Sequence, residues 1–170
     1  MSKKTRAVTL SALFSALSLV VLYIASISPT GQIGIVALAS LFVAAAVIEL
    51  GVSSALNVYA VSSALAMLLL PNRIAPLLYV SFFGYYPVVK SLIERIESAV
   101  LRWALKLAVF NAALTAVWFM LGELVFDFGE LEIPLALVYL GGSVIFAVYD
   151  FGFTKVVWFY QERVSKYIKR

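Results

Sequence analysis

The amino-acid sequence predicts an all-α membrane protein, a polytopic bundle of about six transmembrane helices. Of its 170 residues, 64% are hydrophobic and only 13% are charged, whereas an ordinary globular domain is about 45–50% apolar and about 25% charged. A soluble domain of this size cannot bury so much apolar surface, because much of any small domain faces the solvent. The apolar residues also form stretches long enough to cross a bilayer core about 30 Å thick. We therefore expect one transmembrane helical domain over residues 1–170.

Proline, glycine and polar residues divide the chain into six apolar segments. Residues 28–31 (Ser-Pro-Thr-Gly) end the first segment, Gly51 separates the second from the third, and Pro71 ends the third. Gly84 and Pro87 predict a kink or an early end in the fourth, because proline cannot donate a hydrogen bond within a helix. The predicted helices span residues 7–27, 33–50, 52–70, 74–89, 103–125 and 134–160.

The segment between the fourth and fifth predicted helices is amphipathic. Within residues 91–102, apolar side chains such as Leu92 and Ile96 recur at helical spacing, and charged side chains occupy much of the other face. This pattern predicts an interfacial segment that lies along the cytoplasmic surface of the membrane. Tyr85 and Tyr86, just before it, are expected to belong to the aromatic belt at the same surface.

The distribution of charge predicts which ends of the helices face the cytoplasm. With six crossings and a cytoplasmic N-terminus, all the Lys and Arg residues except Arg73 fall in cytoplasmic segments, as the positive-inside rule expects. Four acids fall on the opposite side, in the loop before the last helix: Glu123, Asp127, Glu130 and Glu132. Five crossings would place the basic C-terminus outside, so we expect both termini in the cytoplasm.

The composition argues against most kinds of catalytic site. The chain has no cysteine and no histidine, which excludes disulfides, thiolate chemistry and the commonest proton shuttle and metal ligand. It contains no glycine-rich phosphate loop with the required lysine. We therefore expect no enzyme activity, no catalytic residue, no metal and no cofactor. We expect the excess of basic residues to keep one face of the protein on the cytoplasmic side of the membrane rather than to bind nucleic acid.

Ionisable residues within predicted spans are expensive in lipid and therefore informative. Lys106 and Asp150 lie at similar depth on adjacent antiparallel helices, which predicts an intramembrane charge pair. The alternative is that Lys106 and Lys155 extend to the lipid headgroups and leave Asp150 with another partner. Glu49, at the end of the second predicted helix, is expected to be solvated.

Small residues on the first helix predict a close contact with another helix. Ala12 and Ala16 are four residues apart, as are Ser11 and Ser15, and such spacing lets two helix backbones approach closely. Packing within the chain is the commoner use of such a face, and docking of a separate protein is the alternative.

Six short helices in 170 residues, cytoplasmic termini and the lack of a nucleotide-binding motif resemble the substrate-binding S components of energy-coupling factor (ECF) vitamin transporters. Those proteins often begin with a basic stub and an Ala-x-x-x-Ala face. Here residues 3–6 (Lys-Lys-Thr-Arg) precede residues 12–16 (Ala-Leu-Phe-Ser-Ala). The resemblance implies that Ala12 and Ala16 dock on a transmembrane coupling subunit associated with ATPases. It also implies an outward-opening solute pocket capped by residues 28–32.

On this hypothesis the chain binds a small solute for uptake, as a multi-pass protein of a prokaryotic plasma membrane. Polar and aromatic residues in the outer half are the candidates for the pocket: Gln32, Arg73, Tyr79, Asn111, Trp118 and Tyr139. Arg73 favours a carboxylate ligand, whereas the acidic loop over residues 123–132 favours a cation. For the aromatic members, Tyr79, Trp118 and Tyr139, an outer interfacial belt is the favoured alternative.

Two other functions remain open at the level of the sequence. A membrane scaffold would use the small-residue face of the first helix and the basic segment 91–102 as binding surfaces. An ion- or proton-coupled carrier would use Asp150 and Lys106, because ionisable groups within spans often mark ion pathways.

Overall fold

The computed structural model describes residues 3–125 and 134–165, and within these ranges it is helical without strands. Within the part of the chain that is described, five helices are long and apolar enough to cross a membrane. Of the acidic loop predicted to face outward over residues 123–132, Glu123 lies in a helix that ends at Val125, and residues 126–132 lie outside the described residues. The elements are α1 (Lys3–Ile27), α2 (Gln32–Leu50), α3 (Val52–Leu69), α4 (Ile74–Leu78), the π-helix η1 (Tyr79–Phe83), α5 (Tyr86–Ile93), α6 (Ala99–Val125) and α7 (Leu135–Arg163).

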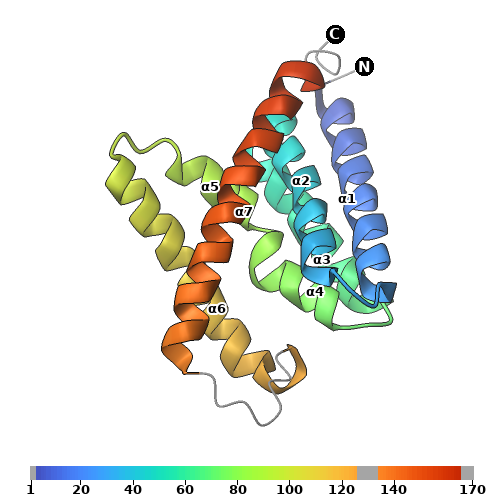
Figure 1. Ribbon diagram of the computed structural model, residues 1–170. Helices are drawn as coiled ribbons and strands as arrows, with labels where there is room; N and C mark the ends of the chain where they lie inside the picture. The colour runs from blue at the N-terminus through green and yellow to red at the C-terminus, as the bar shows by residue number, and fades with distance from the viewer. Residues whose placement is uncertain (1–2, 126–133, 166–170) are drawn as a thin grey trace.

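Helices α1, α2 and α3 form a closely packed unit with α4 (Figure 1). Its interior is made largely of small side chains, and Ala39, Ala46 and Ala55 have no exposed surface. Alanine at a helix contact lets the backbones approach closely, which is how helices gain dispersion energy in lipid. Ser18 of α1 also donates a hydrogen bond to the carbonyl of Ala39, at 3.4 Å. Residues 28–31 and Gly51, which interrupt the apolar segments, thus form tight connections between helices of one packed unit.

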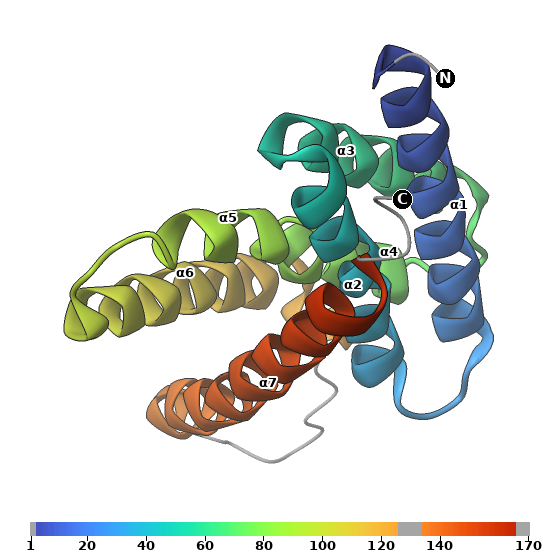
Figure 2. The ribbon, with the colours of Figure 1, turned by 90° about the horizontal axis from the view of Figure 1, so that it is seen from above.

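Helix α7 contacts α2 and crosses α6 at an angle (Figure 1), and the starts of α6 and α7 lie away from the α1–α3 unit, as Figure 2 shows. A cluster of aromatic rings joins both helices to the segment between α4 and α5. Phe110 of α6 stacks on Phe146 of α7 with ring centroids 4.7 Å apart. Phe82 meets both rings edge-on, at 5.5 and 5.8 Å. The aromatic side chains 82–86 therefore belong largely to the interior, and the prediction that Tyr86 lies in an interfacial belt is wrong, because Tyr86 has no exposed surface.

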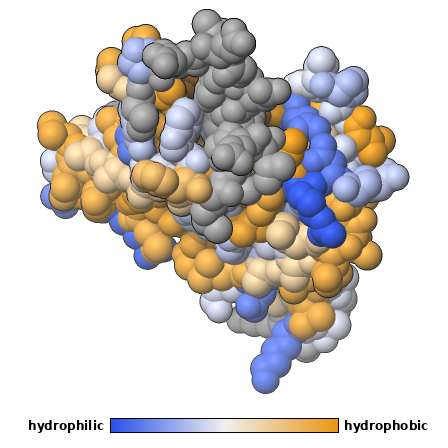
Figure 3. Space-filling model, turned by 90° about the horizontal axis from the view of Figure 1, so that it is seen from below, coloured by the Kyte–Doolittle hydropathy of each residue, from blue (hydrophilic) through white to orange (hydrophobic). Residues whose placement is uncertain are grey.

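The outside of the bundle is strongly apolar. Three side chains of α7, Val144, Ile145 and Val148, are 64–71% exposed, and hydrophobic residues dominate the described surface seen from below (Figure 3). Soluble monomers rarely expose such extensive apolar surface, because its exposure to water is unfavourable. In a membrane these side chains face lipid hydrocarbon instead of water. The apolar helices thus confirm that this is a membrane protein.

The fourth predicted helix, residues 74–89, is broken into three elements that together reach Ile93. Pro87 has no N–H, which weakens the helix around residue 83. The N–H of Gly84 bonds to the carbonyl of Tyr79 at 2.7 Å and so leaves Val80, its partner in an α-helix, free of that bond. The hydroxyl of Tyr59 on α3 donates to the Val80 carbonyl instead, at 2.9 Å. The π-helix is thus held by a side chain of a neighbouring helix.

Residues 91–102 do not form the single interfacial segment that the sequence predicted. The first three residues complete α5, residues 94–98 are not in a helix, and α6 already begins at Ala99 instead of residue 103. Ser98 precedes α6 and accepts a hydrogen bond from the N–H of Leu101 at 3.4 Å, as an N-cap does. Ile93 is buried, which fixes the end of α5 against the bundle.

Gly84 provides the first test. A Cβ at this position would lie 2.6 Å from a ring carbon of Tyr59 and 2.9 Å from one of Tyr79. We predict that Gly84→Ala lowers the free energy of unfolding by about 1–3 kcal/mol, because overpacking displaces both rings. The thermal midpoint of the detergent-solubilised protein measures this effect.

Gly141→Ala is the matched control, because a Cβ at Gly141 meets no described atom within 4 Å. Alanine there should leave the midpoint unchanged or raise it slightly, since alanine favours a helix more than glycine does. Equal midpoints for the two variants would contradict the close packing of Gly84 against Tyr59.

Candidate functional site

The carboxylate of Asp150 on α7 is the centre of a buried polar cluster. Its side chain is only 4% exposed. The carboxylate accepts hydrogen bonds from the hydroxyl of Tyr86 at 2.5 Å and from the ammonium of Lys106 at 2.8 Å. It also accepts one from the ammonium of Lys90. Three elements, α5, α6 and α7, therefore meet on one acidic side chain.

A second acid completes the cluster. One carboxylate oxygen of Glu94 lies 2.9 Å from the nitrogen of Lys90 and 3.1 Å from that of Lys106. Lys90 also donates to the hydroxyl of Thr154 at 2.9 Å. Two lysines and two acids give the cluster no net formal charge. This balance offsets part of the cost of removing the charges from water, which is several kcal/mol for each unpaired ion.

Helical spacing explains how the sequence builds this cluster. Tyr86, Lys90 and Glu94 are successively four residues apart, so the end of α5 presents them on one face. Asp150 and Thr154 are likewise four apart on α7, and the Thr154 hydroxyl donates to the Asp150 carbonyl at 2.7 Å.

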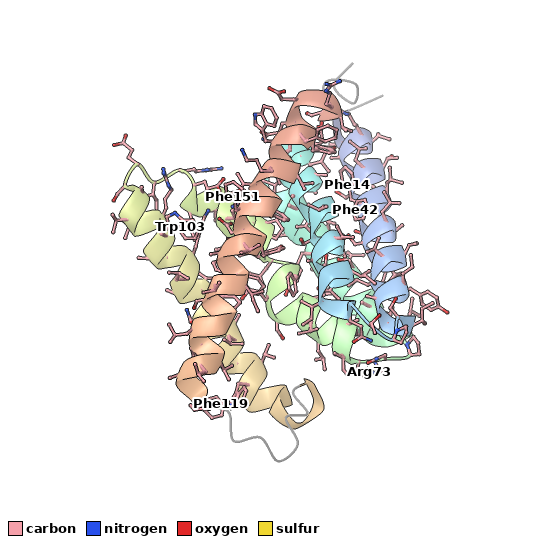
Figure 4. All side chains as sticks on the ribbon, viewed as in Figure 1. Phe14, Phe42, Arg73, Trp103, Phe119 and Phe151 are labelled. Carbon is pink, nitrogen blue, oxygen red and sulfur yellow. The ribbon has the colours of Figure 1, made fainter. Side chains whose placement is uncertain are left out.

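A cavity of about 600 Å³ lies beside the cluster, between the start of α6 and the middle of α7. Asp150, Lys106 and Glu94 face it from one side. The remaining walls combine aromatic and basic residues with one threonine: Arg102, Trp103, Phe151, Thr154, Lys155 and Trp158. Figure 4 shows Trp103 on α6 and Phe151 on α7 in the same half of the molecule.

No protein-family model matches this chain. Comparisons with curated proteins and with solved structures give no significant match either. The function of the protein is therefore inferred from the geometry of its residues.

A second cavity, of about 640 Å³, lies at the other end of the bundle beneath the connection between α1 and α2. Gln32 lines it, and its side-chain amide donates to the carbonyl of Ser28 at 3.2 Å. Asn72 and Leu78 approach from the segment after α3. The left-handed conformation of Gly31, with φ of 72°, allows the chain to turn into α2.

Two other residues predicted to bind solute lie near this end but have partners within the protein. Arg73 donates from its guanidinium to the carbonyl of Met67 and so satisfies the C-terminal end of α3. The hydroxyl of Tyr79 is completely buried and lies 3.0 Å from that of Ser62. Arg73 and Tyr79 thus stabilise helix ends and helix contacts here.

The remaining predicted solute-binding residues lie on α6 and α7. The amide of Asn111 donates to the carbonyl of Leu107 at 2.8 Å and lies 3.5 Å from the hydroxyl of Ser143. The hydroxyls of Tyr139 and Thr115 are 2.6 Å apart. Trp118 is half-buried on α6, one turn from Thr115. The structure thus brings Asn111 and Tyr139 to the α6–α7 contact, away from Gln32.

The predicted docking residues face outward. Ala12 and Ala16 of α1 are exposed, whereas Phe14 and Ser15 between them are buried. The interhelical contacts of α1 therefore use the opposite face and leave the two alanines at the surface.

Glu49 differs from the expectation of a solvated acid. Its side chain has no exposed surface, and the guanidinium of Arg6 lies 3.7 Å away. Neither carboxylate oxygen has a hydrogen-bond partner among the described residues. The packing of α1 against α2 covers this end of α2, a tertiary effect that its position beside Gly51 does not reveal.

The sequence pointed to Lys106 and Asp150 but missed Tyr86, Lys90 and Glu94. Their regular spacing of four residues was the available signal. The same spacing also fits a solvated helix face, because charged residues on an amphipathic segment usually face water.

The cluster provides a second prediction. Asp150→Asn should lower the free energy of unfolding by about 3 kcal/mol or more, because it leaves two buried lysines facing Glu94 alone. Thermal or denaturant unfolding in detergent measures this loss.

Glu97→Gln is the control, since it also converts an acid to an amide but at an exposed position in the same region. It should change stability by less than about 0.5 kcal/mol. If both variants unfold at the same midpoint as the parent protein, Asp150 does not hold the three helices together.

Proposed function

We propose that this chain is a membrane-embedded substrate-binding subunit for uptake of a small solute, energised by a partner ATPase complex. The observation that carries the proposal is the cavity of about 640 Å³ beneath residues 28–32. Its volume lies within the range of small-molecule sites, about 300–1,000 Å³. Its position agrees with the loop-capped pocket that the resemblance to ECF S components implies.

We further propose six membrane crossings with both termini in the cytoplasm, the fourth made by α4, η1 and α5. Two features support this topology. The first turn of α1 and the last turn of α7 lie at the same end of the molecule (Figure 1). The fourth segment begins beside Arg73 at one end, and α6 begins near Trp103 in the opposite half (Figure 4). With the basic termini inside, the cavity beneath residues 28–32 faces outward.

The lining of this cavity favours an uncharged, partly apolar solute. Hydrogen-bonding groups come from Ser28, Thr30, Gln32 and Asn72. Apolar walls come from residues such as Ile33, Ile74 and Leu78. The described residues that line it carry no charge, and Arg73 is engaged at the end of α3. A neutral solute avoids the cost of leaving a charge without a counterion.

A partner must supply the energy, because the sequence has no phosphate-binding loop. The exposed face formed by Ala12 and Ala16 supports docking of a transmembrane coupling subunit, since small residues permit close helix contact.

The solute hypothesis predicts a molecule that co-purifies with the protein. Small molecules released by denaturation and identified by mass spectrometry should include one compound at near-stoichiometric amount. Gln32→Leu should reduce its recovery about tenfold, because one hydrogen bond is lost and a polar solute group is left unpaired.

Gln161→Leu is the matched control, because Gln161 is exposed near the end of α7, far from Gly31 and the loop. It should leave recovery unchanged. Equal recovery from both variants, or the absence of any bound compound, would contradict the proposed site. Retention of a protein partner without a solute would instead favour a membrane scaffold.

The docking hypothesis predicts the effect of filling the face of α1. Ala12→Leu with Ala16→Leu should release the coupling subunit and its ATPase during co-purification, because the added side chains keep the helices apart. Co-purified ATPase, measured against this chain, should fall at least about tenfold.

Ala60→Leu with Ala64→Leu is the control, since these two alanines are also exposed and four residues apart, on α3. This variant should keep the partner. Retention of the ATPase by the α1 variant, or equal loss from both, would contradict docking through Ala12 and Ala16.

A second candidate function is an ion- or proton-coupled carrier, which the buried cluster of Asp150, Lys90 and Lys106 favours. The two functions differ in their source of energy. Uptake that stops when ion gradients are collapsed but continues without ATP would favour the carrier.

A further inference from the structure

The cavity of about 600 Å³ between α6 and α7 has a composition unlike that of the proposed solute site. Its lining includes three basic side chains, Arg102, Lys106 and Lys155, and two tryptophans, Trp103 and Trp158. Basic and tryptophan side chains occur together where a membrane protein meets lipid headgroups, because each has a polar end and an apolar body.

The charge of this cavity is positive once the buried cluster is counted. Lys90 and Lys106 are balanced by Asp150 and Glu94 through ion pairs of 2.8–3.1 Å and the Lys90–Asp150 contact. Arg102 and Lys155 then contribute two further positive charges to the walls. The remaining walls, Trp103, Phe151, Thr154 and Trp158, are uncharged, so the cavity favours an anion.

The donors needed to hold an anion are also present. One guanidinium nitrogen of Arg102 donates to the carbonyls of Ile96 at 2.9 Å and of Glu97 at 3.5 Å. A guanidinium has five N–H groups, more than these two contacts use. Lys155 is exposed, and its ammonium lies 5.4 Å from the ring centre of Phe151. Both groups are charge-assisted donors of the kind that bind phosphate oxygens.

The surroundings of the cavity are apolar. Trp158 is 57% exposed and Phe151 is 65% exposed. Further along the same helix, Val148 and Val144 are also exposed. An anion that enters here therefore sits beside surface suited to hydrocarbon chains. A soluble phosphate compound would leave that surface unused.

We propose that this cavity binds the phosphate headgroup of one anionic phospholipid, with Arg102 and Lys155 as donors. The acyl chains lie along the exposed faces of α6 and α7. Basic pockets between transmembrane helices bind acidic headgroups in this way, and each basic residue near the surface contributes about 1 kcal/mol. The site is separate from the cavity beneath residues 28–32 and does not depend on solute binding.

Native mass spectrometry of the full chain tests this site, in mixed micelles of equimolar phosphatidylglycerol and phosphatidylcholine. The parent protein should retain one phosphatidylglycerol in preference to phosphatidylcholine. Arg102→Gln with Lys155→Gln should weaken phosphatidylglycerol binding about thirtyfold, and Lys155→Gln alone about fivefold. The single variant keeps the test valid if loss of the Arg102 contact to Ile96 disturbs folding.

Arg95→Gln with Arg163→Gln is the matched control. It removes the same net charge from exposed positions outside the cavity lining and should keep the preference for phosphatidylglycerol. The same loss in this control, or equal retention of both lipids by the parent, would overturn the proposal. Displacement of phosphatidylglycerol by millimolar glycerol 3-phosphate would also overturn it, because the site would then recognise soluble phosphate.

Discussion

The ion cluster around Asp150 is the interaction on which the arrangement of the C-terminal half depends. One carboxylate is shared by Tyr86, Lys90 and Lys106, from two different elements. Such a group is stable away from water only when its charge and hydrogen bonds are all satisfied. The cluster therefore requires α5, α6 and α7 to meet at one place. Their remaining contacts are largely between aromatic rings, which fix position less strictly.

The irregular fourth segment, which supplies Tyr86 and Lys90 to this cluster, follows from the proline that it contains. A straight α-helix from Ile74 to Ile93 would have to include Pro87, which removes a hydrogen bond, and the extra residue of the π-helix accommodates that loss. Tyr59 then bonds the carbonyl that the π-helix releases. This adjustment links the closely packed α1–α3 unit to the segment that supplies Tyr86 and Lys90. The bundle is thus continuous from α1 to α7 although the starts of α6 and α7 lie away from the α1–α3 unit.

The sequence predicted most helix boundaries because they depend on local chemistry. Residues 28–31, Gly51 and Pro71 interrupt apolar segments, and the helices end within two residues of these positions. The similar depth of Lys106 and Asp150 on adjacent antiparallel helices was also enough to predict that the two side chains pair. Boundaries that depend on tertiary contacts were predicted less well. The end of α5 is fixed by burial of Ile93, by the contact of Lys90 with Asp150 and by the contacts of Glu94 with Lys90 and Lys106.

Side-chain partners were the least predictable feature of the candidate sites. Arg73, Tyr79 and Asn111 are polar residues in apolar segments, and the sequence does not distinguish a ligand from a neighbouring carbonyl or hydroxyl. The structure provides such partners close by, at Met67, Ser62 and Leu107. Gln32 lines a cavity because its loop turns over the ends of α1 and α2, which depends on how α4 packs beneath.

The proposed topology is tested most directly by cysteine labelling in intact cells, because the chain has no cysteine of its own. Thr30 and Ser98 are both exposed in connections between helices, and the proposed topology places them on opposite sides of the membrane, so each is replaced by cysteine in turn. A membrane-impermeant thiol reagent should label the cysteine at position 30 in intact cells and the one at position 98 only after lysis. Labelling of both positions from outside would contradict a fourth crossing closed by the Asp150 cluster.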